Sequence, residues 1–274
     1  MDIHTLPVSL PHIVVIDADQ RQPSIDLAKK LIAARVAFTY IGPDPELLPE
    51  NVRKHWRENA FELDMPFGIV VDMTWNVPLT DDTILILNDI SLDTPPLILT
   101  TNASETTGSA QELLPEFDFI GFNGLPGFFP LGNVVELAPP RGAHAEAVAM
   151  AKRFFRALGF EVEVIEDRPG YVLPRIISMI INEAAFCVME GVADAEAIDT
   201  AMKLGTNYPK GPLAWADEIG IDVVASILMM LENEYRQERY RPCQLLLQMM
   251  HNSELGVVSG SGFYEYPGAL GELQ

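Results

Sequence analysis

The segment HIVVIDADQRQPSIDLAKKLI, which begins at His12, constrains the fold more than any other part of the sequence. Its first half is a short run of Val and Ile, typical of a parallel strand that is buried on both faces. A polar turn follows, and then Ile25, Leu27 and Leu31 recur at the spacing of an amphipathic helix. A buried strand, a turn and an amphipathic helix predict the opening unit of a doubly wound α/β domain.

Further strand-like segments follow in the first part of the chain. They are short, apolar and bounded by Gly, Pro, Asn or Asp, and they read VAFTYIG, FGIVVDMT, PPLILTTN, FDFIGFNG and NVVELAPP. Strands that alternate with helices favour a mostly parallel sheet. We therefore expect residues 1–168 to form an N-terminal Rossmann-like α/β domain with a doubly wound sheet.

From Leu173 onward the pattern is helical nearly to the end of the sequence. RIISMIINEAAFCVMEGV is apolar almost all round, which is typical of a helix in a core or a subunit interface. The next helix, in DAEAIDTAMKLG, is expected to have Asp194 as its N-cap and Gly205 as its terminator. A third helix is expected over residues 221–240. These patterns predict an all-α domain over residues 169–274.

Composition excludes several function classes. The chain of 274 residues has a formal net charge of −21, which argues against nucleic-acid or anionic-membrane binding. Its two cysteines provide neither a disulfide framework nor a metal-ligand set, so no metal is expected. We find no secretory signal and no run of about 20 apolar residues, and a cytoplasmic location is the expectation.

The helical half carries a set of motifs in a characteristic order. DRPGY is followed by a helix containing Asn-Glu-Ala, then by AIDTAM, GTNYPKGP and GID, and finally by SGSGFYEY. This half resembles the helical domain of the 3-hydroxyacyl-CoA dehydrogenases. TNYPKGPLAW and ERYRPCQLL resemble more narrowly the second half of two-copy enzymes that act on 3-hydroxyadipyl-CoA. The resemblance implies NAD-dependent oxidation of a 3-hydroxyacyl-CoA thioester, and dimerisation through the helical domain.

The phosphate-binding turn departs from the family pattern. Its three glycine positions are occupied here by Asp17, Asp19 and Gln22. Those glycines allow the bend, the close approach of the pyrophosphate and the helix–strand packing. The carboxylates of Asp17 and Asp19 are expected to face the phosphates or, alternatively, to cap the following helix. No bound cofactor is therefore expected, and the alternative expectation is that the protein binds NAD. The acidic residue that binds the ribose falls on Gly42, and Asp44 follows two positions later.

The expected catalytic positions are also altered. The family histidine aligns with Asn123, whose amide cannot accept a proton near neutral pH. Glu136 matches the carboxylate that orients the histidine, or is a solvated residue at a strand end. Ser104, in TTNAS, is either a hydrogen-bond partner for a substrate hydroxyl or part of an ordinary polar turn.

Three hypotheses follow from these positions. In the first, the protein is a family member that lacks normal NAD binding and the catalytic base, and serves as a dimerising or acyl-CoA-binding companion. In the second, it is an active NAD-dependent 3-hydroxyacyl-CoA dehydrogenase with a rebuilt site. In the third, Glu136 acts as a base in different chemistry. The expected partners are a second copy or another subunit, bound through the helical domain, and possibly an acyl-CoA.

Overall fold

The computed structural model describes residues 10–17, 22–42, 44–58, 68–74, 95–101, 106–129 and 132–267. Its chain forms two compact units, and the main division between them falls after Asp167. The first unit contains the sheet, and the second contains Arg168 onward. The short segment Leu125–Phe129 also groups with the second unit.

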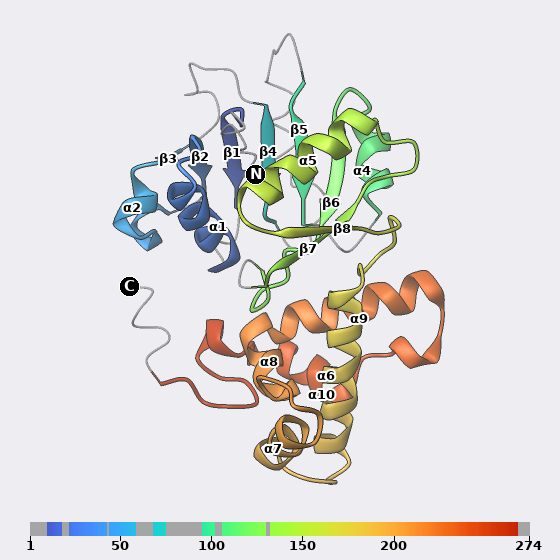
Figure 1. Cartoon of the computed structure of the whole chain (residues 1–274). Helices are drawn as coiled ribbons and strands as arrows, with labels where there is room; N and C mark the ends of the chain where they lie inside the picture. Colours follow the sequence, from blue (N-terminus) through green and yellow to red (C-terminus); the bar gives the residue numbers. More distant parts are fainter. Residues whose placement is uncertain are drawn as a thin grey trace, which may run out of the picture. The chain divides into compact units, whose positions relative to one another are not determined.

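The described part of the first unit contains one sheet of eight strands (Figure 1) in the order β3-β2-β1-β4-β5-β6-β7-β8. The strand bounds are β1 Ile13–Ile16, β2 Phe38–Ile41, β3 Trp56–Arg57, β4 Ile69–Asp72, β5 Leu97–Thr100, β6 Asp118–Phe122, β7 Val134–Ala138 and β8 Glu161–Val164. Neighbouring strands are parallel except β6 and β7, which are antiparallel. The predicted doubly wound, mostly parallel sheet is confirmed.

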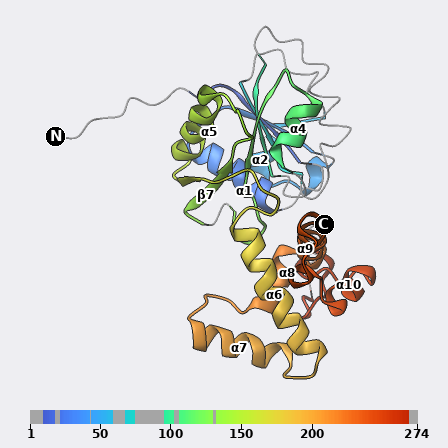
Figure 2. The same cartoon turned by 90° about the vertical axis from the view of Figure 1, so that its right-hand side faces the viewer.

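Helices cover both faces of this sheet, and Figure 2 shows α4 and α5 on opposite sides of it. The helical bounds in this unit are α1 Gln22–Ala33, the 3₁₀ helix η1 Pro45–Leu47, α2 Glu50–Arg53, α4 Thr107–Leu113 and α5 Ala145–Ala157. All residues of β1, β2, β4 and β5 are buried. Burial on both faces explains why these strands read as continuous apolar runs without alternation.

The second unit is built from helices. Their bounds are α6 Leu173–Met189, α7 Ala195–Thr206, α8 Pro212–Ile219, α9 Ile221–Tyr235, η3 Glu238–Tyr240, α10 Gln244–His251 and η4 Val257–Ser259. The predicted N-cap of α7 is confirmed, because the Asp194 carboxylate accepts a hydrogen bond of 2.9 Å from the Ala197 amide.

Two helix ends differ from the prediction. Gly205 does not end α7, which continues to Thr206 and is followed by Asn207 in the left-handed conformation at φ 58°. The third predicted helix ends at Tyr235 rather than at residue 240, because Arg236 is left-handed and a 3₁₀ turn follows. In both cases a non-glycine residue takes the left-handed position that glycine usually fills.

Two buried aspartates connect the loops of the second unit. Asp199 accepts hydrogen bonds from the amides of Leu213 and Ala214, at 2.8 and 2.9 Å. These amides lie in the first turn of α8, so Asp199 satisfies donors that the helix leaves unpaired. Asp217 accepts bonds of 2.9 Å from the amides of Phe263 and Tyr264. The I-D-x-A-M, G-P and G-F-Y-x-Y motifs therefore belong to one framework.

Candidate functional site

The candidate site lies at the carboxyl-terminal edge of the parallel sheet, where β1 and β4 are neighbours. From β1 the strand order runs outward to β2 and β3, whereas from β4 it runs the other way. Open α/β sheets bind ligands at such a reversal of strand order. Asp17, directly after β1, and Asp72, the last residue of β4, are both buried.

Asp17 occupies the first expected glycine position, directly after β1. Its carboxyl accepts a hydrogen bond of 2.7 Å from the Tyr40 hydroxyl and a further bond from the Ser24 hydroxyl. The two hydroxyl groups lie 2.9 Å apart. The carboxyl is therefore directed into this hydroxyl pair, and its placement towards a bound phosphate stays a prediction.

Burial and the neighbouring Asp17 raise the pKa of Tyr40 above its ordinary value. The Tyr40 hydroxyl thus keeps its proton at neutral pH and acts as a donor to Asp17. Neither Tyr40 nor Ser24 was a predicted site residue, because their proximity to Asp17 depends on the packing of β2 and α1 against β1. The sequence signal for Tyr40 was a hydroxyl in a buried strand, and Ser24 lies in the first turn of α1.

Asp72 ends β4 beside Asp17. Its carboxylate accepts bonds of 2.6 Å from the Thr74 hydroxyl and 3.1 Å from the Thr74 amide. The Thr100 hydroxyl lies 3.4 Å from it. Burial raises the pKa of Asp72 to about 6, and the neighbouring Asp17 adds to this effect. The edge of the sheet therefore holds two interacting buried carboxyl groups.

The raised pKa of Asp72 predicts a loss of stability with rising pH. Its stabilising contribution is complete below the ordinary pKa of 3.8 and is lost as pH passes through about 6. The difference between these two pKa values corresponds to about 3 kcal/mol of unfolding free energy. Asp72→Asn is expected to remove this decrease of the unfolding free energy with rising pH. Urea unfolding between pH 4.5 and 7.5 measures it in both proteins. Parallel pH curves for the two proteins would contradict the assignment.

The other expected cofactor positions have different structural roles or are not described. Gln22 is exposed in the first turn of α1, and its amide donates a bond of 2.7 Å to Asp26. Asp44 accepts a bond of 2.8 Å from the Glu46 amide and so caps η1. Asp19 and Ser104 lie outside the described residues.

Asn123 and Glu136 lie opposite one another across the antiparallel strands β6 and β7. The register pairs Phe122 with Leu137, and the Asn123 amide donates a bond of 3.1 Å to the Glu136 carbonyl. Residues directly opposite in an antiparallel pair place their side chains on the same face. Asn123 is buried, and Glu136 is half-buried. The structure thus brings together the two positions that the family pattern assigns to the catalytic pair.

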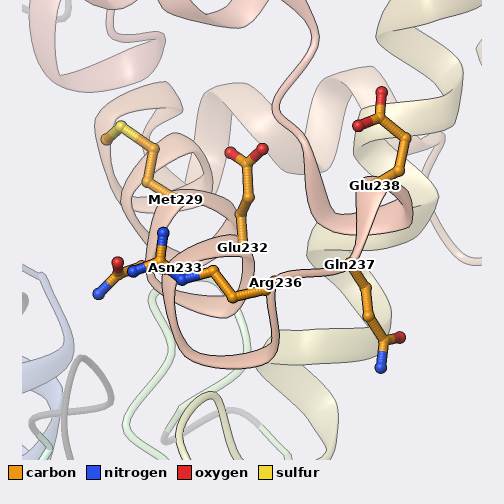
Figure 3. Close-up of a pocket in the computed structure, with 6 residues that line it drawn as sticks. All are labelled: Met229, Glu232, Asn233, Arg236, Gln237 and Glu238. Atoms are coloured by element: carbon orange, nitrogen blue, oxygen red, sulfur yellow. The ribbon is translucent and has the colours of Figure 1, made fainter.

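A surface pocket of about 340 Å³ lies at the end of α9 (Figure 3). It is lined by Met229, Glu232, Asn233, Arg236, Gln237 and Glu238. The predicted site residues are absent from its lining, and its polar groups belong to one helix end and the following turn. We therefore do not assign the pocket to the candidate site.

The described residues include no cluster of three or more His, Cys, Asp or Glu side chains arranged to hold a metal ion. A search of the same residues found no helix with the length and apolar character needed to cross a membrane.

Comparisons with known proteins agree with the motifs of the second unit. Residues 170–266 match a family model described as 3-hydroxyacyl-CoA dehydrogenase, C-terminal domain. A 3-hydroxybutyryl-CoA dehydrogenase of Bradyrhizobium diazoefficiens is 41% identical over 140 residues, which are 51% of this chain and 48% of that protein. The chain thus spans about half the length of this relative.

A second relative matches nearly the whole chain. It is a probable 3-hydroxybutyryl-CoA dehydrogenase of Deinococcus radiodurans, 32% identical over 254 residues, which cover 92% of this chain and 91% of that protein. Among solved structures, FadB2 of Mycobacterium tuberculosis matches with a TM-score of 0.76 and 21% identity, covering 94% of this chain and 99% of the other. At this identity the structural match shows the fold alone.

Proposed function

Since the chain belongs to the 3-hydroxyacyl-CoA dehydrogenase family, we propose that it is a dimerising, acyl-CoA-binding companion that lacks normal NAD binding and NAD-dependent oxidation. The single observation that carries this proposal is the residue opposite Glu136. An asparagine stands there, where the family resemblance implies a histidine.

The amide of Asn123 explains the proposed loss of oxidation. A substrate hydroxyl must give up its proton as the alcohol is oxidised, and the amide has no basic nitrogen to accept it. Loss of a general base lowers the rate by about 10²- to 10⁴-fold. Asn123 can still hold a hydroxyl group through its amide, which is compatible with binding of a 3-hydroxyacyl thioester.

Two residues at the sheet edge support the proposed loss of dinucleotide binding. At the first glycine position a side chain is present, and hydrogen bonds to Tyr40 and Ser24 fix it. Asp72 lies on the neighbouring strand end. A carboxylate beside a bound diphosphate would repel it, since two like charges about 4 Å apart interact by about 1 to 4 kcal/mol between water-like and surface-like dielectric values. We therefore derive no hydride transfer at this edge.

Ligand titration tests the proposal. NADH fluorescence is expected to show no saturable binding at sub-millimolar concentration, whereas calorimetry with 3-hydroxybutyryl-CoA is expected to show binding. A family member with the glycine-rich turn and the histidine serves as the positive control for NADH. A micromolar dissociation constant for NADH would overturn the proposal.

The second candidate function is NAD-dependent oxidation of a short 3-hydroxyacyl-CoA at a rebuilt site. The specific observation in its favour is the likeness to the probable dehydrogenase of Deinococcus radiodurans, which extends over 92% of this chain and so includes the sheet-bearing unit. NADH binding together with turnover of 3-hydroxybutyryl-CoA would select this candidate.

The proposed dimer rests on the apolar surface of the second unit. Asp199 is the only buried residue among the twelve of α7. Leu204 is 82% exposed, and Val192 just before the helix is 69% exposed. These exposed apolar side chains support the proposed association surface, and a second copy of the helical unit is its proposed occupant.

Sedimentation tests the dimer. The wild-type protein is expected at twice the 30.3 kDa chain mass, and Leu204→Asp is expected to shift it towards the monomer. Leu113→Asp, at a position 64% exposed in the first unit, is the matched control and should leave the mass unchanged. A wild-type protein that sediments as a monomer would contradict the proposal.

A further inference from the structure

The pocket at the end of α9, called the α9 pocket below, is separate from the residues of the sheet edge. Its lining comes from the last two turns of α9 and from the turn that follows, so all of it belongs to the second unit (Figure 3). The pocket has a volume of about 340 Å³, which is large enough to hold a small organic molecule.

Arg236 contributes a positive charge to the α9 pocket. It directly follows α9 with φ 50°, a left-handed conformation that is uncommon for arginine and usual for glycine. Its guanidinium group forms no hydrogen bond or ion pair with another residue that the structure describes. Five donors are therefore available to a ligand, in a planar arrangement that matches a carboxylate.

Glu232 contributes a negative charge to the same pocket, four residues before Arg236. Glutamate and arginine at this spacing on a continuous helix are neighbours and can pair. Here α9 ends at Tyr235, and in the described part of the chain neither side chain has an ion-pair partner. Figure 3 shows the two side chains pointing in different directions. The pocket therefore presents two opposite charges that do not neutralise each other.

The other lining residues add polar and apolar contacts. Glu238 also carries a negative charge, but it forms an ion pair of 2.8 Å with Arg241, which lies outside the lining. The Asn233 carboxamide can both donate and accept hydrogen bonds. Met229 is 38% exposed and offers an adaptable apolar surface. The charges available to a ligand are therefore mainly those of Glu232 and Arg236.

We propose that the α9 pocket binds a small free amino acid. The Arg236 guanidinium binds the carboxylate of this ligand, and the Glu232 carboxylate binds its ammonium group. Met229 contacts an apolar side chain of the ligand. A ligand with a single charge satisfies only one of the two groups. The inference goes beyond the proposed function, because no residue of the pocket is assigned to acyl-CoA binding.

Three ligands of similar shape test this inference. L-leucine carries both charges, isoamylamine lacks the carboxylate, and 4-methylpentanoate lacks the ammonium group. The chemical shift of the Met229 methyl group, assigned with Met229→Leu in methyl-labelled protein, reports binding in the pocket. L-leucine is expected to shift this resonance at millimolar concentration, with an affinity about 10-fold higher than that of either analogue.

Two variants remove one charge each. Arg236→Gly is expected to lower the affinity for L-leucine about 10-fold, to the level of isoamylamine. This variant should retain the fold, because glycine adopts the left-handed conformation without steric cost. Glu232→Gln is expected to lower the affinity to the level of 4-methylpentanoate.

Two matched controls remove the same charges next to the pocket. Arg239→Gln and Glu234→Gln change exposed residues that are not part of the lining. Both should leave the affinity for L-leucine unchanged. Thermal unfolding of each variant establishes that the fold is retained.

The inference is overturned if L-leucine leaves the Met229 resonance unchanged. Equal affinities for L-leucine and isoamylamine would also overturn it, since the pocket would then bind organic cations through its acidic residues alone. Titration with 3-hydroxybutyryl-CoA is a separate measurement, so neither result decides the proposed function.

Discussion

Histidine at position 123 is expected to raise NAD-dependent oxidation of 3-hydroxybutyryl-CoA by about 10²- to 10⁴-fold in a protein whose glycine-rich turn is restored. The background for this comparison replaces Asp17, Asp19 and Gln22 by glycine and retains Asn123. Asn123→His then adds an imidazole on the strand position opposite Glu136. The measured quantity is the rate of NADH formation at saturating substrate.

The restored turn needs a compensating change in the core. Asp17→Gly removes the carboxylate that accepts the hydrogen bond of the buried Tyr40 hydroxyl, which then keeps the Ser24 hydroxyl as a polar neighbour at 2.9 Å. Loss of a hydrogen bond to a charged group costs about 1.5 to 3 kcal/mol. The background therefore also carries Tyr40→Phe, and its unfolding free energy is measured before the rates are compared.

Glu136→Gln in the histidine variant is the matched control. If Glu136 orients the imidazole and stabilises its charged form, the amide should remove much of the gained rate and shift the pH dependence of kcat. A folded histidine variant that binds NADH and is inert would show that the paired positions on β6 and β7 are insufficient for the family reaction.

The elements of the fold were predictable where a local pattern decides the structure. The strands of the central sheet are mainly apolar runs, because both of their faces are buried, and the polar residues Asp72 and Thr100 come at the carboxyl ends of β4 and β5. The predicted N-cap Asp194 needs only the amide three residues later. Such signals involve residues close together in the sequence.

The candidate site was less predictable because it depends on distant residues. The alignment identified Asp17, but the direction of its carboxyl is set by Tyr40, which is 23 residues away. The position of Asn123 opposite Glu136 likewise depends on the register of two strands. Gly205 was predicted to end α7, yet Asn207 takes the left-handed position, and the glycine lies within the helix.

The two units differ in how far they follow the family pattern. Asp199 and Asp217 hold the helical motifs together in the second unit, where the family model matches residues 170–266. In the first unit the fold is kept, but the residues at the glycine and histidine positions have other chemistry.

Gly262→Ala is expected to destabilise the second unit severely because of this framework. A Cβ atom at position 262 would lie 2.1 Å from Oδ1 of Asp217. Asp217 is fully buried, and it also accepts a hydrogen bond of 3.1 Å from the Tyr266 hydroxyl. The methyl group must therefore displace a carboxylate that holds two backbone amides and this hydroxyl.

The expected loss is about 2 to 5 kcal/mol of unfolding free energy, because overpacking and broken charge-assisted hydrogen bonds act together. Gly205→Ala is the matched control. It lies within α7 with no heavy atom near its added Cβ, so alanine should stabilise the helix by about 0.5 to 1 kcal/mol. Urea unfolding measures both variants. Equal stability of the two would mean that the segment after Gly260 packs independently of Asp217, and that the shared motifs do not form one framework.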